Sequence, residues 1–236
     1  MYTLTLFILF WFRIVIRIKS KIILGVIDLH HKNDVKKYKQ IYNLIIQYIS
    51  LYILFGGIKL LEHGYIQIYT GDGKGKTTAA LGLALRALGH GWNVLVIQFT
   101  KGDSATSYGE IVSASKFLPK LDVVQFGMDR VVYSHNVCMD DFKEAKKGWE
   151  FAKEAIKGGK YQLIVLDEIN ICTAMNMIKV SDVKDALINK PESLEIVLTG
   201  RYAHPELKAL AHLVTEMKPI KHYFDSGVMA RQGIEY

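Results

Sequence analysis

A short glycine-rich segment constrains the fold of this chain more than any other feature. Residues 70–78, Thr-Gly-Asp-Gly-Lys-Gly-Lys-Thr-Thr, lie between an apolar stretch typical of a strand, 65–70, and an alanine-rich stretch typical of a helix, 77–88. Its three glycines let the backbone curl so that successive N–H groups point toward one centre. The helix that follows adds the positive end of its dipole. The sequence therefore predicts a P-loop, a cradle for the phosphate groups of a nucleotide.

Side chains of this loop suit a triphosphate bound with Mg²⁺. Lys76 supplies a flexible cation for the terminal phosphates, and the Thr77 hydroxyl is placed to ligate the metal. Lys74 is a further cation, either solvated or in contact with a second phosphate. A strict P-loop pattern has glycine where Thr70 stands, but the surrounding strand, Gly-Lys-Thr run and helix argue against an ordinary glycine-rich turn. We expect ATP to be bound by Gly71, Asp72, Gly73, Lys74, Gly75, Lys76, Thr77 and Thr78.

Strands and helices are expected to alternate from residue 64 onward. Apolar runs predict strands at 65–70, 93–99, 122–126, 161–166 and 194–199. Helices are expected at 77–88, 108–117, 139–157, 181–189 with Ser181 as N-cap, and 205–213. Strands that are apolar throughout and alternate with helices imply a mainly parallel sheet with helices on both faces. The predicted fold class is α/β, P-loop NTPase-like (RecA-like), with ligands at the carboxyl ends of the strands.

Two acids follow the fourth predicted strand. In a P-loop fold, a carboxylate at the end of such a strand positions Mg²⁺, so Asp167 and Glu168 are candidate metal-site residues. Successive strand residues point to opposite faces, so we expect only one of the two acids to bind the metal directly. The alternative is a strand end with solvated acids. Arg201, after the fifth predicted strand, is a candidate phosphate contact or a surface ion-pair partner.

Charge and composition divide the chain near residue 63. Residues 1–63 hold nine Lys/Arg against three Asp/Glu, whereas residues 64–236 hold 21 against 20. The overall charge of +7 therefore arises mostly from the first part, and residues 64–236 show no broad basic face for a nucleic acid. We expect no nucleic-acid partner. The only two cysteines, Cys138 and Cys172, form no metal-binding or disulfide pattern, which fits a cytoplasmic protein.

Residues 1–63 form a hydrophobic, basic extension that contains neither Ala nor Pro. Its basic residues follow the first apolar run, unlike those of a signal peptide. Residues 40–58 carry no charged side chain and are long enough to span a membrane, but the lysines before them would place the P-loop on the side where ATP is scarce. We favour an extension without a function in the reaction over a membrane contact or an ordered helix pair.

Several segments together resemble the ATP:corrinoid adenosyltransferases of the P-loop type. The opening match is residues 64–80, which include the P-loop. Further matches follow in order at 96–102 (Val-Ile-Gln-Phe-Thr-Lys-Gly), 165–168 (Val-Leu-Asp-Glu), 198–201 (Leu-Thr-Gly-Arg), 214–217, 221–228 and 233–236 (Gly-Ile-Glu-Tyr). The resemblance covers 64–236, and residues 1–63 match nothing in the family.

The resemblance implies a transferase. In this family the Co(I) of a reduced corrinoid attacks C5′ of ATP and the whole triphosphate leaves, in adenosylcobalamin biosynthesis or salvage. Carried onto matching positions, Lys76, Thr77 and Glu168 are the catalytic groups. Thr77 and Glu168 are expected to ligate Mg²⁺ with support from Asp167, and Arg201 to contact a phosphate.

Two positions depart from the family pattern. Asp72 stands where many members have Asn. Some members carry aromatic residues after the third strand that help remove the lower ligand of cobalt, whereas residues 127–132 contain none and only Phe126 and Tyr133 flank them. The corrinoid contacts are therefore left open.

The expected partners are the reduced corrinoid, a flavodoxin-like or other reductant, and a second copy of the chain in a homodimer. Two other functions compete with this one. The first is another P-loop ATPase or kinase, which would yield ADP. The second is a membrane-tethered, ATP-dependent switch in which residues 1–63 matter.

Overall fold

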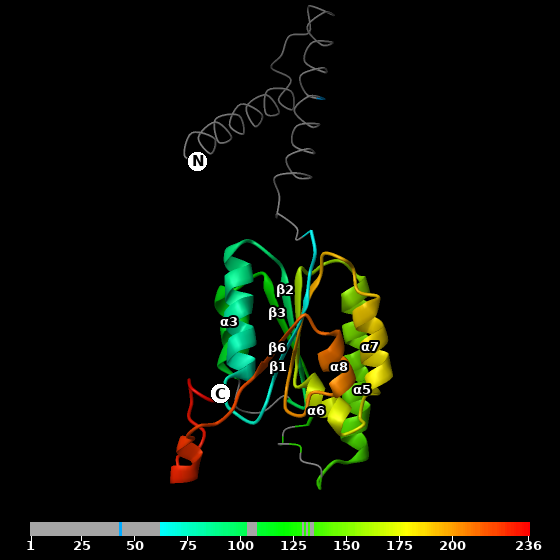
Figure 1. The fold of residues 1–236 in the computed structure, drawn as a ribbon. Coiled ribbons are helices and arrows are strands. Elements are labelled where there is room, and N and C mark those ends of the chain that lie inside the picture. Colours follow the sequence, from blue (N-terminus) through cyan, green and yellow to red (C-terminus); the bar gives the residue numbers. More distant parts are fainter. Residues whose placement is uncertain (1–42, 44–61, 103–107, 129, 131, 133–134) are drawn as a thin grey trace, which may run out of the picture. The chain divides into compact units, whose positions relative to one another are not determined.

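The computed structural model describes residues 43, 62–102, 108–128, 130, 132 and 135–236 (Figure 1). By internal contacts the chain divides into two units, Met1–Gly57 and Ile58–Tyr236. The predictions made for residues 1–61 lie outside the described residues. In the part of the chain that is described, no helix combines the length and apolarity needed to cross a membrane.

The unit Ile58–Tyr236 is built on a parallel sheet. Its described strands are β1 (Ile66–Thr70), β2 (Val94–Phe99), β3 (Leu121–Phe126), β4 (Leu163–Asp167), β5 (Glu195–Thr199) and β6 (Leu213–Glu216). They lie in the order β3-β2-β4-β5-β1-β6, and every pair is parallel. The α/β fold class with a parallel sheet is confirmed.

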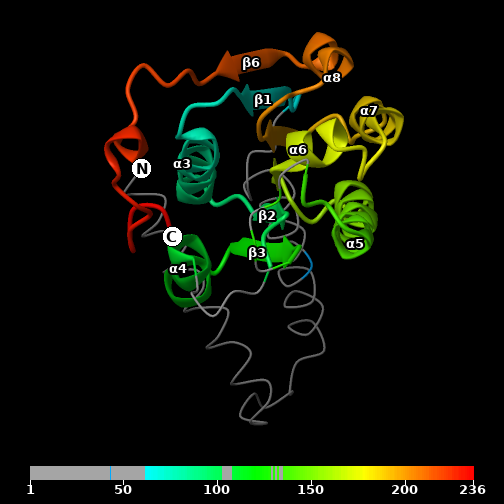
Figure 2. The same cartoon turned by 90° about the horizontal axis from the view of Figure 1, so that it is seen from below.

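Helices cover both faces of this sheet. They are α3 (Lys76–Gly89), α4 (Gly109–Phe117), α5 (Met139–Lys157), α6 (Ile169–Ala174), α7 (Val180–Ile188) and α8 (Pro205–Leu210), with a 3₁₀ turn η1 (Tyr223–Ser226). Viewed from below, α3 and α4 lie on one side of the sheet and α5 to α8 on the other (Figure 2). This two-sided cover is the arrangement expected from strands that are apolar throughout.

The core explains why the central strands are mostly apolar. Every residue of β2, β4 and β5 is buried. On the α3 face, the small side chains of Ala80, Ala84 and Ala87 pack against these strands, and on the other face Trp149 and Ile156 of α5 do so. Since the strands are parallel, their carboxyl ends meet at one edge, where the P-loop, Asp167 and Arg201 also emerge.

Two sequence predictions about element ends were wrong. Ser181 is not the N-cap of α7, because that helix begins at Val180 after the extended residue Lys179, and the Ser181 hydroxyl contacts Asp182 instead. The helix expected to run to residue 213 ends at Leu210, and Leu213 begins β6, which pairs with β1. All residues of β6 are exposed, so it lacks the buried pattern of a strand and forms through its pairing partner.

Candidate active site

The P-loop follows β1 and wraps around the start of α3. Gly71 and Gly75 have φ angles of 96° and 117°, a left-handed conformation that favours glycine. The N–H of Gly73 donates to the carbonyl of Met217 at 2.7 Å, and a Cβ added at Gly71 would lie 2.5 Å from that carbonyl oxygen. The glycines therefore permit both the curl of the loop and its close contact with the chain that follows β6.

Lys76 is buried at the first position of α3. Its Nζ donates to the carbonyl oxygens of Gly71 at 2.9 Å and Gly73 at 2.8 Å. Burial lowers the pKa of Lys76. The negative charge of Glu168 acts in the opposite direction and the positive charge of Arg201 in the same direction, but both effects are smaller than that of burial. The ammonium is thus held inside the curl of the loop, where an anionic ligand could replace the weaker carbonyl acceptors.

Thr77 and Asp167 are in direct contact. The Thr77 hydroxyl donates to Oδ1 of Asp167 at 2.8 Å, and the Thr199 hydroxyl donates to the same oxygen at 2.6 Å. Asp167 is fully buried at the end of β4. Burial raises the pKa of this carboxyl, but the ion pair with Lys101 and the hydroxyl hydrogen bonds outweigh it and hold the pKa below its usual range.

Glu168 faces differently from its neighbour. Its φ of 65° is left-handed, and its N–H donates to the Thr199 hydroxyl oxygen at 2.9 Å. Burial, followed by repulsion from Asp167, raises the pKa of Glu168. Glu168 lines a cavity, whereas Asp167 lies against Thr77. The two acids are separated because Asp167 ends β4, whereas the left-handed Glu168 already belongs to the turn that leads into α6. The assignment of Glu168 as the direct metal ligand stays a prediction.

Arg201 and the two remaining charged residues of the loop lie at its outer side. Arg201 forms an ion pair with Asp72 at 3.3 Å, with both side chains about half exposed or more. This contact joins the turn after β5 to the P-loop. Lys74 instead pairs with Glu235 at 2.5 Å. Thr78 is exposed on α3, and nothing in the structure tests its predicted contact with ATP.

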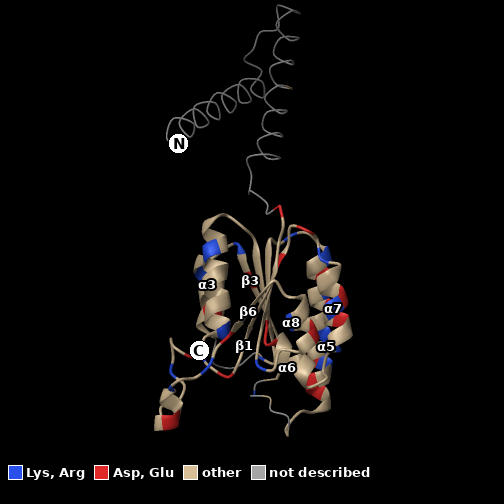
Figure 3. Cartoon of the chain, viewed as in Figure 1, with Lys and Arg blue, Asp and Glu red and all other residues tan. Residues whose placement is uncertain are grey.

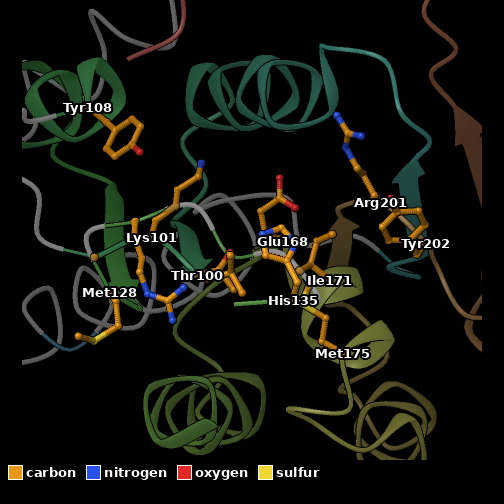
Figure 4. Close-up of a pocket in the computed structure, with 13 residues that line it drawn as sticks. Thr100, Lys101, Tyr108, Met128, His135, Glu168, Ile171, Met175, Arg201 and Tyr202 are labelled. Carbon is orange, nitrogen blue, oxygen red and sulfur yellow. The ribbon is translucent and has the colours of Figure 1, made fainter. Parts of the chain in front are cut away.

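A cavity of about 650 Å³ opens at the carboxyl ends of the strands. It is lined by Thr100, Lys101, Gly102, Tyr108, Met128, Arg130, Val132, His135, Glu168, Ile171, Met175, Arg201 and Tyr202. Lys101, Glu168 and Arg201 extend their charged ends toward α3, and Met128 and Met175 lie farther from it (Figure 4). The cavity thus has a charged side next to the P-loop helix, and a remainder in which apolar side chains are mixed with Arg130 and His135.

Lys101 is a site residue that the sequence analysis did not single out. Its Nζ lies 2.8 Å from Oδ2 of Asp167 and 5.4 Å from the centre of the Tyr108 ring. Burial lowers the pKa of this ammonium, but Asp167 outweighs burial and raises the pKa above its usual range. The preceding residue, Thr100, has a φ of 56°, which is rare for a β-branched residue. A Lys two residues after a buried strand, at the edge where ligands bind, was the available signal.

Phe126, one of the aromatics that flank the departure from the family pattern, packs away from this cavity. The centre of its ring lies 5.6 Å from that of Phe151 on α5, and its partly buried side chain packs against the core. Tyr133 lies outside the described residues.

Described charges of both signs are interspersed over the helices in the view of Figure 3.

Comparison with known proteins identifies a family that this chain resembles. A profile of the family described as ATP:corrinoid adenosyltransferase BtuR/CobO/CobP matches residues 62–236. A corrinoid adenosyltransferase of Sinorhizobium sp. is 40% identical over 178 residues, which cover 74% of this chain and 81% of that protein. The corrinoid adenosyltransferase of Escherichia coli (strain K12) is 34% identical over 175 residues, covering 74% of this chain and 87% of that protein.

A further relative is longer. An uncharacterized protein from Nostoc sp. is 38% identical over 180 residues, and the aligned part covers 72% of this chain and 48% of that protein. This chain therefore spans about half the length of the Nostoc relative. The matched residues 62–236 include the P-loop, Asp167, Glu168 and Arg201. This chain belongs to the ATP:corrinoid adenosyltransferase family of enzymes.

Proposed function

We propose that this enzyme transfers the 5′-deoxyadenosyl group of ATP to the Co(I) of a reduced corrinoid and releases triphosphate, in the biosynthesis or salvage of adenosylcobalamin. The observation that carries the proposal is a P-loop with a buried Lys76 next to a partly apolar cavity of about 650 Å³, in a member of this family. A nucleotide in the loop and a large, partly apolar substrate in the cavity would lie next to each other.

The loop residues would hold the triphosphate. Gly71, Gly73 and Gly75 leave room for backbone N–H groups to approach phosphate oxygens, and the start of α3 adds its dipole. Lys76 would exchange its carbonyl acceptors for phosphate oxygens. Arg201 lies close enough to Asp72 to reach the same loop, which supports its role as a second phosphate contact. These charges favour the departure of triphosphate because they stabilise the negative charge that develops on it.

The residues around Thr77 fit Mg²⁺. A hydroxyl and a carboxylate in contact are oxygen donors, and Mg²⁺ in such sites takes few protein ligands because phosphates and waters complete its shell. Thr77 would ligate the ion, with Glu168 or Asp167 as the carboxylate. Bound Mg²⁺ would neutralise part of the triphosphate charge.

The transfer step itself does not require the protein to remove a proton. An electron pair on Co(I) forms the bond to C5′ while the C5′–O bond breaks, and its electrons leave with triphosphate. The nucleophile carries no proton, so no general base is needed, and the cavity has to orient the corrinoid and exclude water. Met128, Val132, Ile171, Met175 and Tyr202 supply apolar surface for this purpose.

The proposal includes partners. The corrinoid has to be reduced to Co(I) before transfer, so we propose a flavodoxin-like or other one-electron reductant. We also propose a homodimer in the cytoplasm, without a nucleic-acid partner.

The test is incubation of the full chain with ATP, Mg²⁺ and a chemically reduced corrinoid. We expect a light-sensitive carbon–cobalt bond, seen in the absorption spectrum, and one tripolyphosphate for each adenosylated corrinoid. ADP or free phosphate without adenosylated corrinoid would instead indicate a kinase or an ATPase and would refute the proposal.

A further inference from the structure

The two lysines of the P-loop face different groups. Lys76 points into the loop, and the charges of Glu168 and Arg201 affect its pKa. Lys74 instead reaches the C-terminal segment, residues 217–236, where its Nζ lies 2.5 Å from Oε1 of Glu235 and 5.7 Å from the centre of the Tyr223 ring. Lys74 therefore has an electrostatic partner that is separate from Asp167 and Glu168.

Glu235 is fixed by several groups besides Lys74. The Tyr223 hydroxyl donates to Oε1, and the N–H of Arg231 donates to Oε2 at 2.7 Å. The Arg231 guanidinium lies 4.9 Å from the centre of the Tyr223 ring. Hydrogen bonds, first from Lys74 and then from Tyr223, hold the pKa of Glu235 far below its usual range. An isolated exposed ion pair contributes little, but a network of this kind fixes both partners.

The C-terminal segment also holds the neighbouring loop residue through its backbone. The N–H of Gly73 donates to the carbonyl of Met217 at 2.7 Å, and the N–H of Met217 donates to the carbonyl of Thr70 at 2.8 Å. The segment lies on the α3 side of the sheet, beside the start of that helix (Figures 1 and 2). The C-terminal segment thus binds two consecutive loop residues, Gly73 through a backbone hydrogen bond and Lys74 through an ion pair.

We propose that Glu235 is a positioning residue for ATP binding, which fixes the outer side of the P-loop through Lys74 while Met217 fixes it through Gly73. The inference rests on the proposed function in that it takes ATP as the ligand. Backbone N–H groups bind phosphates best when they are already oriented, because the ligand then has no loop to order. Loss of the Lys74–Glu235 pair leaves that ordering to ATP and weakens its binding.

The position of the pair also predicts which parameters stay constant. Among the described residues, those that line the cavity include none from 217–236. Lys76 keeps its own contacts to the loop carbonyls. Corrinoid binding and the transfer step should therefore depend little on Glu235.

The experiment compares the full chain with its Glu235→Gln, Lys74→Met and doubly substituted variants. The dissociation constant of ATP is measured by equilibrium dialysis without corrinoid, and kcat and both KM values in the transfer assay. Each single variant should weaken ATP binding roughly three- to tenfold. The double variant should bind ATP no more weakly than the single variant with the lower affinity, because each substitution removes the same interaction. In Glu235→Gln, the kcat and the KM of the corrinoid should change less than about twofold.

Two controls accompany these variants. Glu206→Gln removes another lysine–glutamate ion pair, with Lys184 at 2.8 Å, between α7 and α8, and should leave ATP binding unchanged. Glu235→Asp keeps the charge and should recover part of the affinity, and thermal denaturation checks that every variant is folded.

Two results would overturn the inference. Unchanged ATP affinity in both single variants would show that the pair positions nothing, and tighter ATP binding in Glu235→Gln would show that Glu235 competes with ATP for Lys74. ATP binding that depends on Glu235 in a protein that forms no adenosylated corrinoid would support the inference and refute only the proposed reaction.

Discussion

The hydroxyl of Thr77 donates a hydrogen bond of 2.8 Å to Oδ1 of Asp167, which joins the start of α3 to the end of β4 across 90 residues of sequence. Thr199, at the end of β5, donates to the same oxygen at 2.6 Å. One carboxylate oxygen therefore ties together three elements at the edge where the P-loop lies. This contact fixes the position of the hydroxyl that we expect to ligate Mg²⁺.

Lys76→Ala is expected to reduce kcat/KM for ATP by a factor of about 100 or more, because a charge that stabilises the leaving triphosphate is removed. Steady-state adenosylation assays at varied ATP measure this, with circular dichroism to confirm folding. Lys146→Ala, on the exposed side of α5, is the matched control and should behave as the unmodified chain. Normal turnover of Lys76→Ala at saturating ATP would contradict the assignment of the site.

Thr77→Val should raise the Mg²⁺ concentration that gives half-maximal activity by roughly tenfold or more, since valine keeps the shape but removes the hydroxyl ligand. Thr77→Ser retains the hydroxyl and should stay close to the unmodified chain. Mg²⁺ titrations at fixed ATP distinguish the two variants. Equal Mg²⁺ dependence in Val and Ser variants would exclude Thr77 as a ligand.

Asp167→Asn should lower the free energy of unfolding at pH 7 by about 2–4 kcal/mol, because the buried ammonium of Lys101 loses its partner. The folded-state pKa of Asp167 lies below its usual value, so ionised Asp167 contributes stability that is lost as pH falls through that pKa. The stability difference between the two proteins should therefore shrink below about pH 4. Urea unfolding at pH 3 to 7 measures it, and a constant difference would contradict the prediction.

Gly200→Ala should impair activity more than Gly159→Ala. Both glycines have positive φ, 118° and 67°, so each variant has an unfavourable backbone conformation, costing about 1 kcal/mol. A Cβ at Gly200 would also lie 3.1 Å from Oε2 of Glu168, whereas one at Gly159 meets no atom within 4 Å. Activity corrected for folded fraction isolates the effect of displacing Glu168, and equal losses in both variants would argue against it.

Removal of residues 1–57 should leave adenosylation within about twofold of the full chain. The unit Ile58–Tyr236 contains the sheet and the site, and the family match begins at residue 62. Transfer assays on the shortened and full chains, at equal concentrations of folded protein, make the comparison. Loss of activity in a folded, ATP-binding shortened chain would favour the alternative in which residues 1–63 have a function.

The sequence by itself determined the fold class and the location of the phosphate loop. Apolar runs such as 94–97 and 196–198 have to be covered on both faces, and that requirement implies a parallel sheet between helices. The glycines at 71, 73 and 75 permit a curled backbone, and the strand and helix patterns on either side identify that curl as a phosphate loop. Local rules were sufficient for these features because backbone conformation and burial leave a direct pattern in the residues.

Only the tertiary structure decided which charged groups meet. Lys101 reaches Asp167 and Glu235 reaches Lys74 across 66 and 161 residues of sequence, and no local pattern encodes such pairs. The strand β6 likewise depends on β1, because its own residues are all exposed. Contacts of this kind arise where separate elements converge at the carboxyl edge of the sheet, and their energies depend on burial and neighbours that the sequence does not state.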